Sequence, residues 1–174
     1  MKKTIIIGLI IVALTVLIDQ ISKLLMVSIL VNEGGTIGVI DNFFKLQLHY
    51  NKGAAFSSFS GNFPFLMGMT AIATIVFIIM ARWASFDTKK FYSLGLYLMI
   101  GGMIGNFIDR VFNQDLGVVD FLSFTFFGWD FAVFNLADSF LVVGVICLMI
   151  DLIFFDAKRE KAKKMYIFSH FFIN

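Results

Sequence analysis

Four long apolar segments alternate with polar connections along the chain. Each is long enough for a membrane-spanning helix, since a hydrocarbon core of about 30 Å needs about 20 helical residues. The predicted helices cover approximately residues 5–30, 63–83, 91–112 and 131–155. We expect one integral membrane domain over 1–174, with the first helix retained rather than cleaved, loops at 31–62 and 113–130, and a tail at 156–174.

The first connection carries a different periodicity. Polar and apolar residues alternate over 45–50, which is typical of a half-buried strand, and residues 36–40 are a suitable partner. In the second connection, apolar residues surround a single acid, Asp120, which favours an extended or amphipathic segment on the membrane surface. The predicted fold class is therefore membrane all-α: a four-transmembrane-helix bundle with a small extracytoplasmic β element and a surface-lying loop.

The composition supports a membrane protein. Of 174 residues, 59% are hydrophobic and 15% charged, whereas soluble proteins average about 45–50% apolar and about 25% charged residues. The net charge of +2 is too small to indicate nucleic-acid binding. The single cysteine, Cys147, lies in the middle of the last apolar segment and excludes an internal disulfide.

The basic residues predict the orientation of the helices. Ten of the 14 lie before the first span, around the link between the second and third spans, or after the fourth: Lys2, Lys3, Arg82, Lys89, Lys90, Lys158, Arg159, Lys161, Lys163 and Lys164. By the positive-inside rule this side is cytoplasmic. Both termini are then expected in the cytoplasm and the two longer connections outside, in a multi-pass cytoplasmic membrane protein.

Polar side chains interrupt three of the four spans at a similar depth near the outer side. They are Asp19 and Lys23 in the first, Asn106, Asp109 and Arg110 in the third, and Asn135 and Asp138 in the fourth. Such residues are costly near hydrocarbon and are rare there unless they pair or serve a function. The spacing of Asp19 and Lys23 allows an ion pair, which could also simply help the helix leave the bilayer. Consecutive residues project about 100° apart, so Asp109 and Arg110 need separate partners.

The available residue types point to carboxylate chemistry. No serine has a plausible histidine partner, Cys147 lies deep in a span, and no H-E-x-x-H zinc motif occurs. Two aspartates held close together share one proton, as in aspartic proteases. Asp120 and Asp138 are the best candidates, because a loop could bring the first over the second at the membrane surface.

Three alternatives remain open from the residues alone. A proton-coupled or ion transporter would also carry carboxylates in its spans. A divalent-metal site could use the carboxylates of Asp19, Asp109, Asp120 and Asp138. A membrane scaffold without enzymatic activity would need none of them.

Five short motifs follow one another along the chain: Asp19-Gln20-x-Ser22-Lys23, Asn51-x-Gly53-Ala54-Ala55, Gly101-Gly102 to Asn106-x-x-Asp109-Arg110, Val118-Val119-Asp120-Phe121 and Phe134-Asn135-x-Ala137-Asp138. In this order they resemble the motifs of the lipoprotein signal peptidases, the bacterial type II signal peptidases. Each motif is weak alone, but five in order over residues 19–138 are specific. The resemblance does not extend to the aromatic tail 165–174.

The resemblance implies an aspartyl endopeptidase that removes prolipoprotein signal peptides just before the diacylglyceryl-modified cysteine. It implies catalysis by Asp120 and Asp138, without metal or cofactor. Substrate, or the cyclic peptide inhibitor globomycin, would contact Asn51, Gly53, Asn106, Arg110 and Asn135. Asp19, Lys23 and Asp109 would support the site. Outside these motifs, His49 is interpreted as a solvated strand residue.

Overall fold

The computed structural model describes residues 2–53, 63–114, 116–162 and 165. Within them lie four helices that are long and apolar enough to cross a membrane. The helices are α1 (Lys2–Asn32), α2 (Phe63–Met80) with the 3₁₀ turn η2 (Ala81–Trp83), α3 (Lys90–Phe112), and α4 (Leu136–Ile150) with the π turn η3 (Asp151–Asp156). The strands are β1 (Thr36–Ile40), β2 (Phe44–Asn51), β3 (Val118–Phe126) and β4 (Trp129–Asp130). Ala54 and Ala55 of the second motif and tail residues 166–174 lie outside the described residues.

Helix α3 is the centre of the helical part and packs mainly against α4 and α1. Its spanning window is 61% buried, compared with 6% for α2. Close approach of α3 and α4 depends on glycine, because a Cβ on Gly95 would lie 2.5 Å from the carbonyl oxygen of Gly144. The outer faces of α1, α2 and α4 expose leucine, isoleucine and valine, as expected for helices surrounded by lipid.

The four strands form one antiparallel sheet in the order β1-β2-β3-β4. The strands predicted over 36–40 and 45–50 are thus confirmed as β1 and β2. The segment predicted to be extended around Asp120 is β3, which pairs with β2 and places His49 opposite Asp120. The sheet combines strands from both connections, so it brings Asp120 of the second connection beside β2 of the first.

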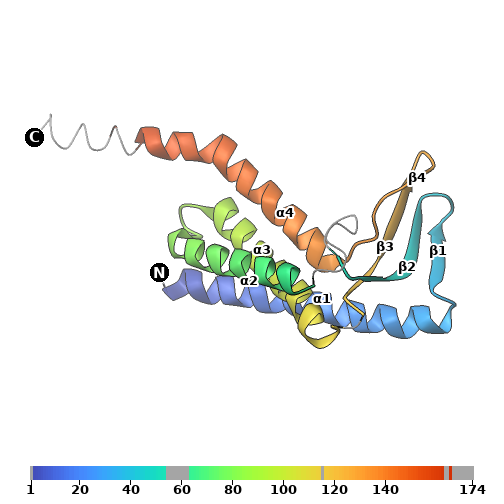
Figure 1. The fold of residues 1–174 in the computed structure, drawn as a ribbon. Helices are drawn as coiled ribbons and strands as arrows, with labels where there is room; N and C mark the ends of the chain where they lie inside the picture. Colours follow the sequence, from blue (N-terminus) through green and yellow to red (C-terminus); the bar gives the residue numbers. More distant parts are fainter. Residues whose placement is uncertain (1, 54–62, 115, 163–164, 166–174) are drawn as a thin grey trace, which may run out of the picture.

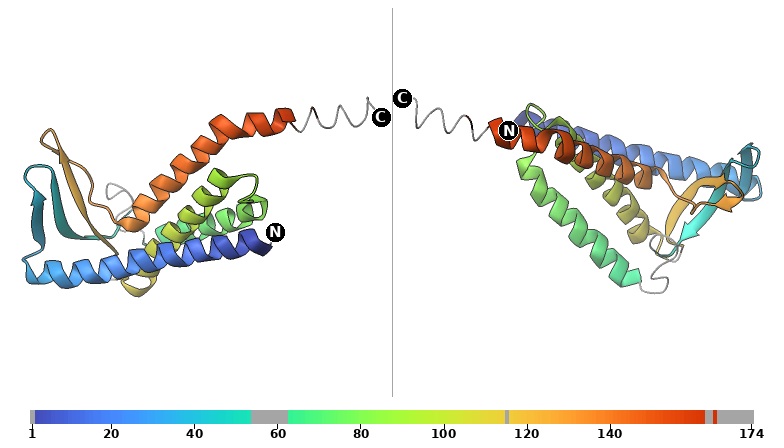
Figure 2. Two further views of the ribbon diagram at one scale, coloured as in Figure 1. Left: turned by 180° about the vertical axis from the view of Figure 1, so that it is seen from behind. Right: turned by 90° about the horizontal axis from the view of Figure 1, so that it is seen from above.

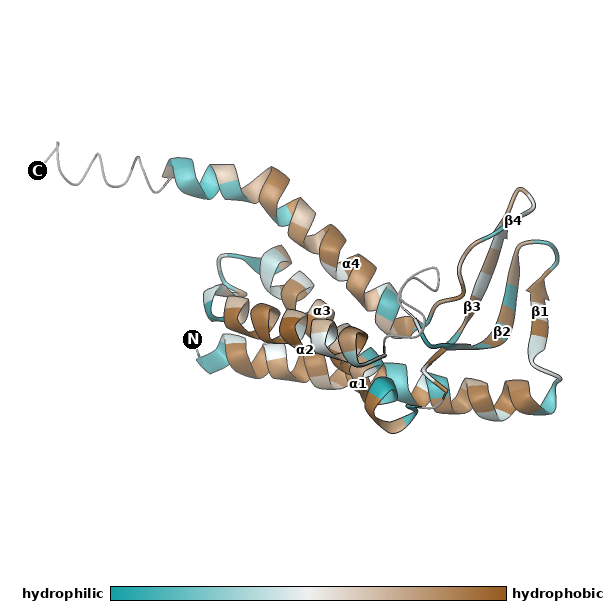
Figure 3. Ribbon diagram, viewed as in Figure 1, coloured by the Kyte–Doolittle hydropathy of each residue, from teal (hydrophilic) through white to brown (hydrophobic). Residues whose placement is uncertain are grey.

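The sheet lies at one end of the molecule, far from the start of the first helix (Figures 1 and 2). The start of α1 and the end of η3 are at one end of the molecule, and all four strands are at the other. In Figure 3 the helices are mostly brown, with teal segments where α1, α3 and α4 approach the sheet. The polar interruptions of three helices consequently meet near the sheet.

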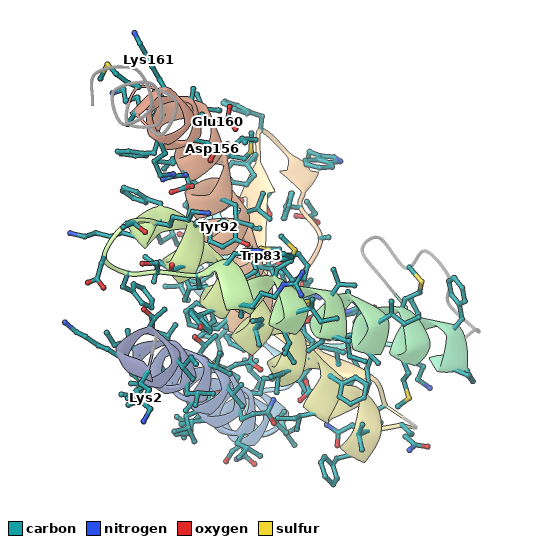
Figure 4. All side chains as sticks on the ribbon, turned by 90° about the vertical axis from the view of Figure 1, so that its left-hand side faces the viewer. Lys2, Trp83, Tyr92, Asp156, Glu160 and Lys161 are labelled. Atoms are coloured by element: carbon teal, nitrogen blue, oxygen red, sulfur yellow. The ribbon has the colours of Figure 1, made fainter. Side chains whose placement is uncertain are left out.

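The end opposite the sheet is polar and aromatic (Figure 4). Lys2, Asp156, Glu160 and Lys161 are charged residues at this end, and Trp83 and Tyr92 lie among them. Next to them, Arg159 donates two hydrogen bonds to the buried carboxylate of Asp151 on η3 and one to Asp156. This ion pair neutralises an acid that would otherwise be isolated near the end of an apolar helix.

Helix α4 begins at Leu136, whereas the sequence suggested a start near Phe131. Residues 131–134 instead run beside β3. There the Phe134 N–H donates to the Leu122 carbonyl oxygen at 3.0 Å, and the Leu122 N–H donates to the Phe134 carbonyl oxygen at 2.8 Å. Asn135 is the N-cap, since its side chain accepts from the Asp138 backbone N–H. The apolar pattern of α4 therefore extends back over residues 131–134, which are strand-like and not helical.

Candidate active site

The polar residues of the three helices and of β3 form one buried network. Hydrogen bonds or ion pairs link Asp19, Lys23, Asn51, Asn106, Asp109, Asp120, Asn135 and Asp138. Arg110 joins at the edge, where its guanidinium donates to the Asn106 carbonyl oxygen at 3.3 Å. Gly53 joins through its N–H, which donates to the Asn51 side chain at 2.9 Å. The structure thus brings together all ten site residues predicted from the sequence.

Asp120 is held by two asparagine amides. Its two carboxylate oxygens accept from Asn51 at 3.1 Å and from Asn135 at 2.7 Å. The residue is only 1% exposed. Burial, followed by the negative charge of Asp138, raises the pKa of the Asp120 carboxyl to about 7, because both disfavour its ionised form.

Asp138 is fixed at the first turn of α4. One of its oxygens accepts from the Asn106 amide at 2.8 Å, and the other accepts from the Asn135 backbone N–H at 3.2 Å. With the reciprocal bond from the Asp138 N–H to Asn135, this forms a capping box. The N-terminal cap of α4, formed by residues three apart in the sequence, therefore sets the position of the Asp138 carboxylate.

Asn135 connects the two carboxylates directly. Its side-chain amide donates to Asp120, while its backbone N–H donates to Asp138 and its side-chain oxygen accepts from the Asp138 N–H. The amide also donates to the side-chain oxygen of Asn106 at 3.0 Å. Asn135 is fully buried, so its conformation holds both aspartates in one arrangement.

Lys23 fills the centre of the remaining network. Its ammonium group lies 2.8 Å from Asp19, 3.0 Å from Asp109 and 3.0 Å from the Asn106 side-chain oxygen. Three donors thus meet three acceptors. Gly105 allows this packing, because a Cβ there would lie 2.6 Å from an Asp19 oxygen. The predicted pairing of Asp19 with Lys23 is confirmed.

Asp19 and Asp109 also anchor backbone. The Ala137 N–H at the start of α4 donates to Asp19 at 2.9 Å, and the Val119 N–H of β3 donates to Asp109 at 3.1 Å. Each acid therefore ties a different element to the helical core. Arg110 points elsewhere, which agrees with the prediction that Asp109 and Arg110 need separate partners.

A cavity of about 800 Å³ lies over Asp120 and Asp138. Its lining is polar at one end and apolar along α4. The polar residues are His49, Asn51, Asn106, Arg110, Asp120, Asp138 and Ser139. The apolar residues are Val118, Phe131, Ala132, Val133, Phe134, Leu141, Val142 and Val143. An elongated ligand with a peptide-like part and an apolar part fits this division.

The metal alternative finds no support in the described part of the chain. There, no three side chains from histidine, cysteine, aspartate and glutamate lie close enough to hold an ion. Asp19 and Asp109 face Lys23, whereas Asp120 and Asp138 face asparagine amides. The four aspartates thus form two separate pairs.

Sequence reasoning missed several residues of the site. His49 is exposed and lines the cavity, although its position two residues before Asn51 on a strand could have indicated the same face. Gln20, which donates to Asp19 and Asp109, lay inside a motif without an assigned role. The apolar wall could not be recognised in the sequence, because residues 141–143 are as apolar as the rest of the span.

Comparisons with known proteins agree with this arrangement. The family model described as "Signal peptidase (SPase) II" matches residues 11–154. The lipoprotein signal peptidase of Bacillus pumilus (strain SAFR-032) is 40% identical over 146 residues, which cover 83% of this chain and 90% of that protein. That of Geobacillus kaustophilus (strain HTA426) is 39% identical over 152 residues, covering 87% and 96%.

Two solved structures of bacterial membrane enzymes are similar in fold. One superposes with a TM-score of 0.71 at 34% identity and covers 83% of this chain and 86% of its own. The other has a TM-score of 0.70 at 34% identity and covers 85% and 93%. These similarities give no support to the transporter alternative.

Proposed function

The chain belongs to the signal peptidase II family, and on that premise we propose that it is an aspartic endopeptidase that cleaves signal peptides from prolipoproteins. Asp120 and Asp138 are the catalytic pair. The observation that carries this proposal is the shared asparagine: Asn135 contacts both carboxylates at the polar end of a cavity of about 800 Å³.

The resting pair holds one proton, on Asp120. Its buried carboxyl has a pKa of about 7, so it remains protonated up to neutral pH. Asp138 is the base of the pair, and its two oxygens accept from the Asn106 amide and from the Asn135 backbone N–H. One member of the pair thus donates a proton and the other accepts one, as acid–base catalysis requires.

Hydrolysis then needs only the two carboxyl groups and water. The oxygen of a water molecule attacks the scissile carbonyl carbon. Asp138 takes a proton from that water, and Asp120 gives its proton to the carbonyl oxygen. When the C–N bond breaks, Asp138 passes its proton to the leaving amine. Asp120 regains a proton from the diol, and the pair returns to its starting state.

The substrate enters with its lipid-modified end in the apolar part of the cavity. Leu141, Val142 and Val143 of α4 and residues 131–134 supply that wall. The peptide part lies over Asp120 and Asp138, which places the cut just before the diacylglyceryl-modified cysteine. The lipid makes this arrangement selective through van der Waals packing against the wall, which an unmodified precursor cannot provide.

Four residues around the pair contact the substrate or a globomycin-type cyclic peptide. All four line the cavity: Asn51, Gly53, Asn106 and Arg110. The guanidinium of Arg110 makes one hydrogen bond to the described residues, so other N–H groups are available to a peptide carbonyl.

The cavity faces the extracytoplasmic side of the bacterial cytoplasmic membrane. The basic residues gather at the end of the molecule opposite the sheet (Figure 1), and the positive-inside rule assigns that end to the cytoplasm. Water reaches the catalytic pair from outside, while the substrate's signal helix stays in the membrane.

The test uses purified protein and a matched pair of precursors, one lipidated and one with an unmodified cysteine. We expect cleavage of the lipidated precursor only, inhibition by globomycin, and no cleavage by Asp138→Asn. Equal cleavage of both precursors would remove the role of the lipid. Cleavage by Asp138→Asn would remove that residue from the catalytic pair.

A further inference from the structure

His49 is the one ionisable residue of the described cavity lining that belongs to none of the five motifs. We propose that His49 is a substrate-positioning residue, whose neutral imidazole hydrogen-bonds a backbone peptide group beside the scissile bond. This inference rests on the proposed function, since it assumes that the scissile bond lies over Asp120 and Asp138.

The strand register places His49 directly beside the catalytic pair. His49 and Asp120 are opposite each other in the antiparallel pairing of β2 with β3. Directly opposite side chains project from the same face of a sheet, with Cβ atoms about 4.5–5.5 Å apart. The imidazole therefore lies within reach of any peptide group that contacts Asp120.

The neighbouring pair confirms which face His49 occupies. Tyr50 and Val119, one position along, line a separate cavity of about 230 Å³ beside α1, together with Lys23 and Asp109. His49 and Asp120 line the larger cavity. Because side chains alternate along a strand, this division follows from the register and not from the rotamer of one side chain.

His49 has hydrogen-bonding capacity that the asparagines of the site lack. The side chains of Asn51 and Asn106 each use both their oxygen and their nitrogen within the network. His49 is exposed, and its side chain has no hydrogen bond or ion pair to another described residue. Arg110 on α3 and His49 on β2 are thus the groups free to hold a peptide from two sides.

The neutral imidazole is the productive form. The charged or titratable groups that face it across the cavity are Asp120 on β3, Asp138 on α4 and Arg110 on α3. An imidazolium next to Asp120 would favour the ionised carboxylate and so remove the proton that the reaction needs. It would also lose its acceptor nitrogen.

Steady-state kinetics on the lipidated precursor test this role with two substitutions. His49→Phe keeps a planar ring without hydrogen-bonding atoms, and we expect KM to rise about tenfold with kcat almost unchanged, since one hydrogen bond is lost. His49→Gln keeps a hydrogen-bonding amide, and its KM should stay within about threefold of wild type. Tyr50→Phe, on the same strand but the opposite face, is the matched control and should behave as wild type.

The split between KM and kcat, together with rescue by His49→Gln, separates positioning from a purely structural role. A wild-type KM for His49→Phe would overturn the proposal. Equal loss of Tm and activity in both His49 variants would also overturn it, by assigning the residue to folding.

Binding measurements distinguish this proposal from the proposed function. Asp138→Asn protein should bind the lipidated precursor without cutting it, and adding His49→Phe should weaken that binding about tenfold. If Asp138→Asn still cleaves, the proposed function fails. If it is inactive and His49→Phe leaves the affinity unchanged, only the role of His49 fails.

Discussion

Two pairs of aspartates share one buried network but have different partners. Asp19 and Asp109 both contact the ammonium group of Lys23, at 2.8 and 3.0 Å. Asp120 and Asp138 contact only asparagine amides and backbone N–H groups among the described residues. Asp120 and Asp138 line a cavity of about 800 Å³, whereas Lys23 and Asp109 line a separate cavity of about 230 Å³.

The difference indicates how one residue type serves two purposes. Asp19 and Asp109 form ion pairs with Lys23 and accept from backbone N–H groups, so they act as fixed anchors for α4 and β3. Amides orient carboxylates without removing the repulsion between them. Burial, followed by that repulsion, raises the pKa of the Asp120 carboxyl to about 7.

Removing either amide-held carboxyl should affect cleavage more than any other change. Asp120→Asn and Asp138→Asn should each lower kcat by a factor on the order of 10² to 10⁴, because acid or base catalysis is lost. The amide has the same size and keeps one of the two acceptor oxygens, so Tm should fall only slightly. Cleavage of lipidated precursor and thermal unfolding in detergent check both statements. A variant that cleaves normally would not belong to the pair.

Removing the cation should affect stability instead. Lys23→Met leaves two buried carboxylates without their counter-ion, which costs about 3–5 kcal/mol for a buried pair broken from one side. We expect a large loss of unfolding free energy, measured by denaturant titration in micelles. Lys90→Met, at an exposed lysine, is the control and should change little. Adding Asp19→Asn and Asp109→Asn to Lys23→Met should recover stability; no recovery would contradict the charge explanation.

Asn135 both caps α4 and contacts the proposed catalytic pair, so its variants should separate these roles. Asn135→Ala loses the N-cap, at a cost of about 1 kcal/mol, and also lowers kcat. Asn135→Ser keeps an N-cap acceptor, but its shorter side chain lacks the amide that donates to Asp120, so part of the Tm should recover while kcat stays low. Parallel measurement of Tm and kcat checks this. Recovery of both by Asn135→Ser would contradict the proposed role of the amide.

The pH dependence should be the mildest difference between the two pairs. The pKa of Asp120 is raised to about 7, so cleavage should fall about tenfold per pH unit above pH 7 as its proton is lost. The folded protein holds this proton more tightly than the unfolded chain. Stability should therefore decrease as pH rises from about 4 to 7, and Asp120→Asn should lack that contribution. A rate that is flat up to pH 9 would contradict a protonated Asp120.

The helices and the first two strands could be predicted from periodicity alone. Apolar stretches of about 20 residues identify spans, and the alternation over 45–50 identified β2. The start of α4 could not be located, because residues 131–134 are as apolar as the helix. Only the cap formed by Asn135 and Asp138 ends that ambiguity, and a cap signal is weak within an apolar sequence.

The members of the site were predictable, and so were the pairing of Asp19 with Lys23 and, from the resemblance, that of Asp120 with Asp138. Rise per residue places the polar positions of α1, α3 and α4 at one depth. It does not say that Asp109 meets Lys23, because that depends on how the helices rotate against each other. The close approach of α1 and α3 also needs the glycine at position 105, because a Cβ there would lie 2.6 Å from an Asp19 oxygen.

The most direct test compares one member of each pair, Asp109→Asn and Asp120→Asn, in a single assay of cleavage rate per folded molecule. We predict that Asp109→Asn loses stability but retains most of the wild-type rate per folded molecule, whereas Asp120→Asn stays folded and falls to background. A folded Asp109→Asn protein without activity, together with an Asp120→Asn protein that cleaves, would contradict the assignment of the two pairs.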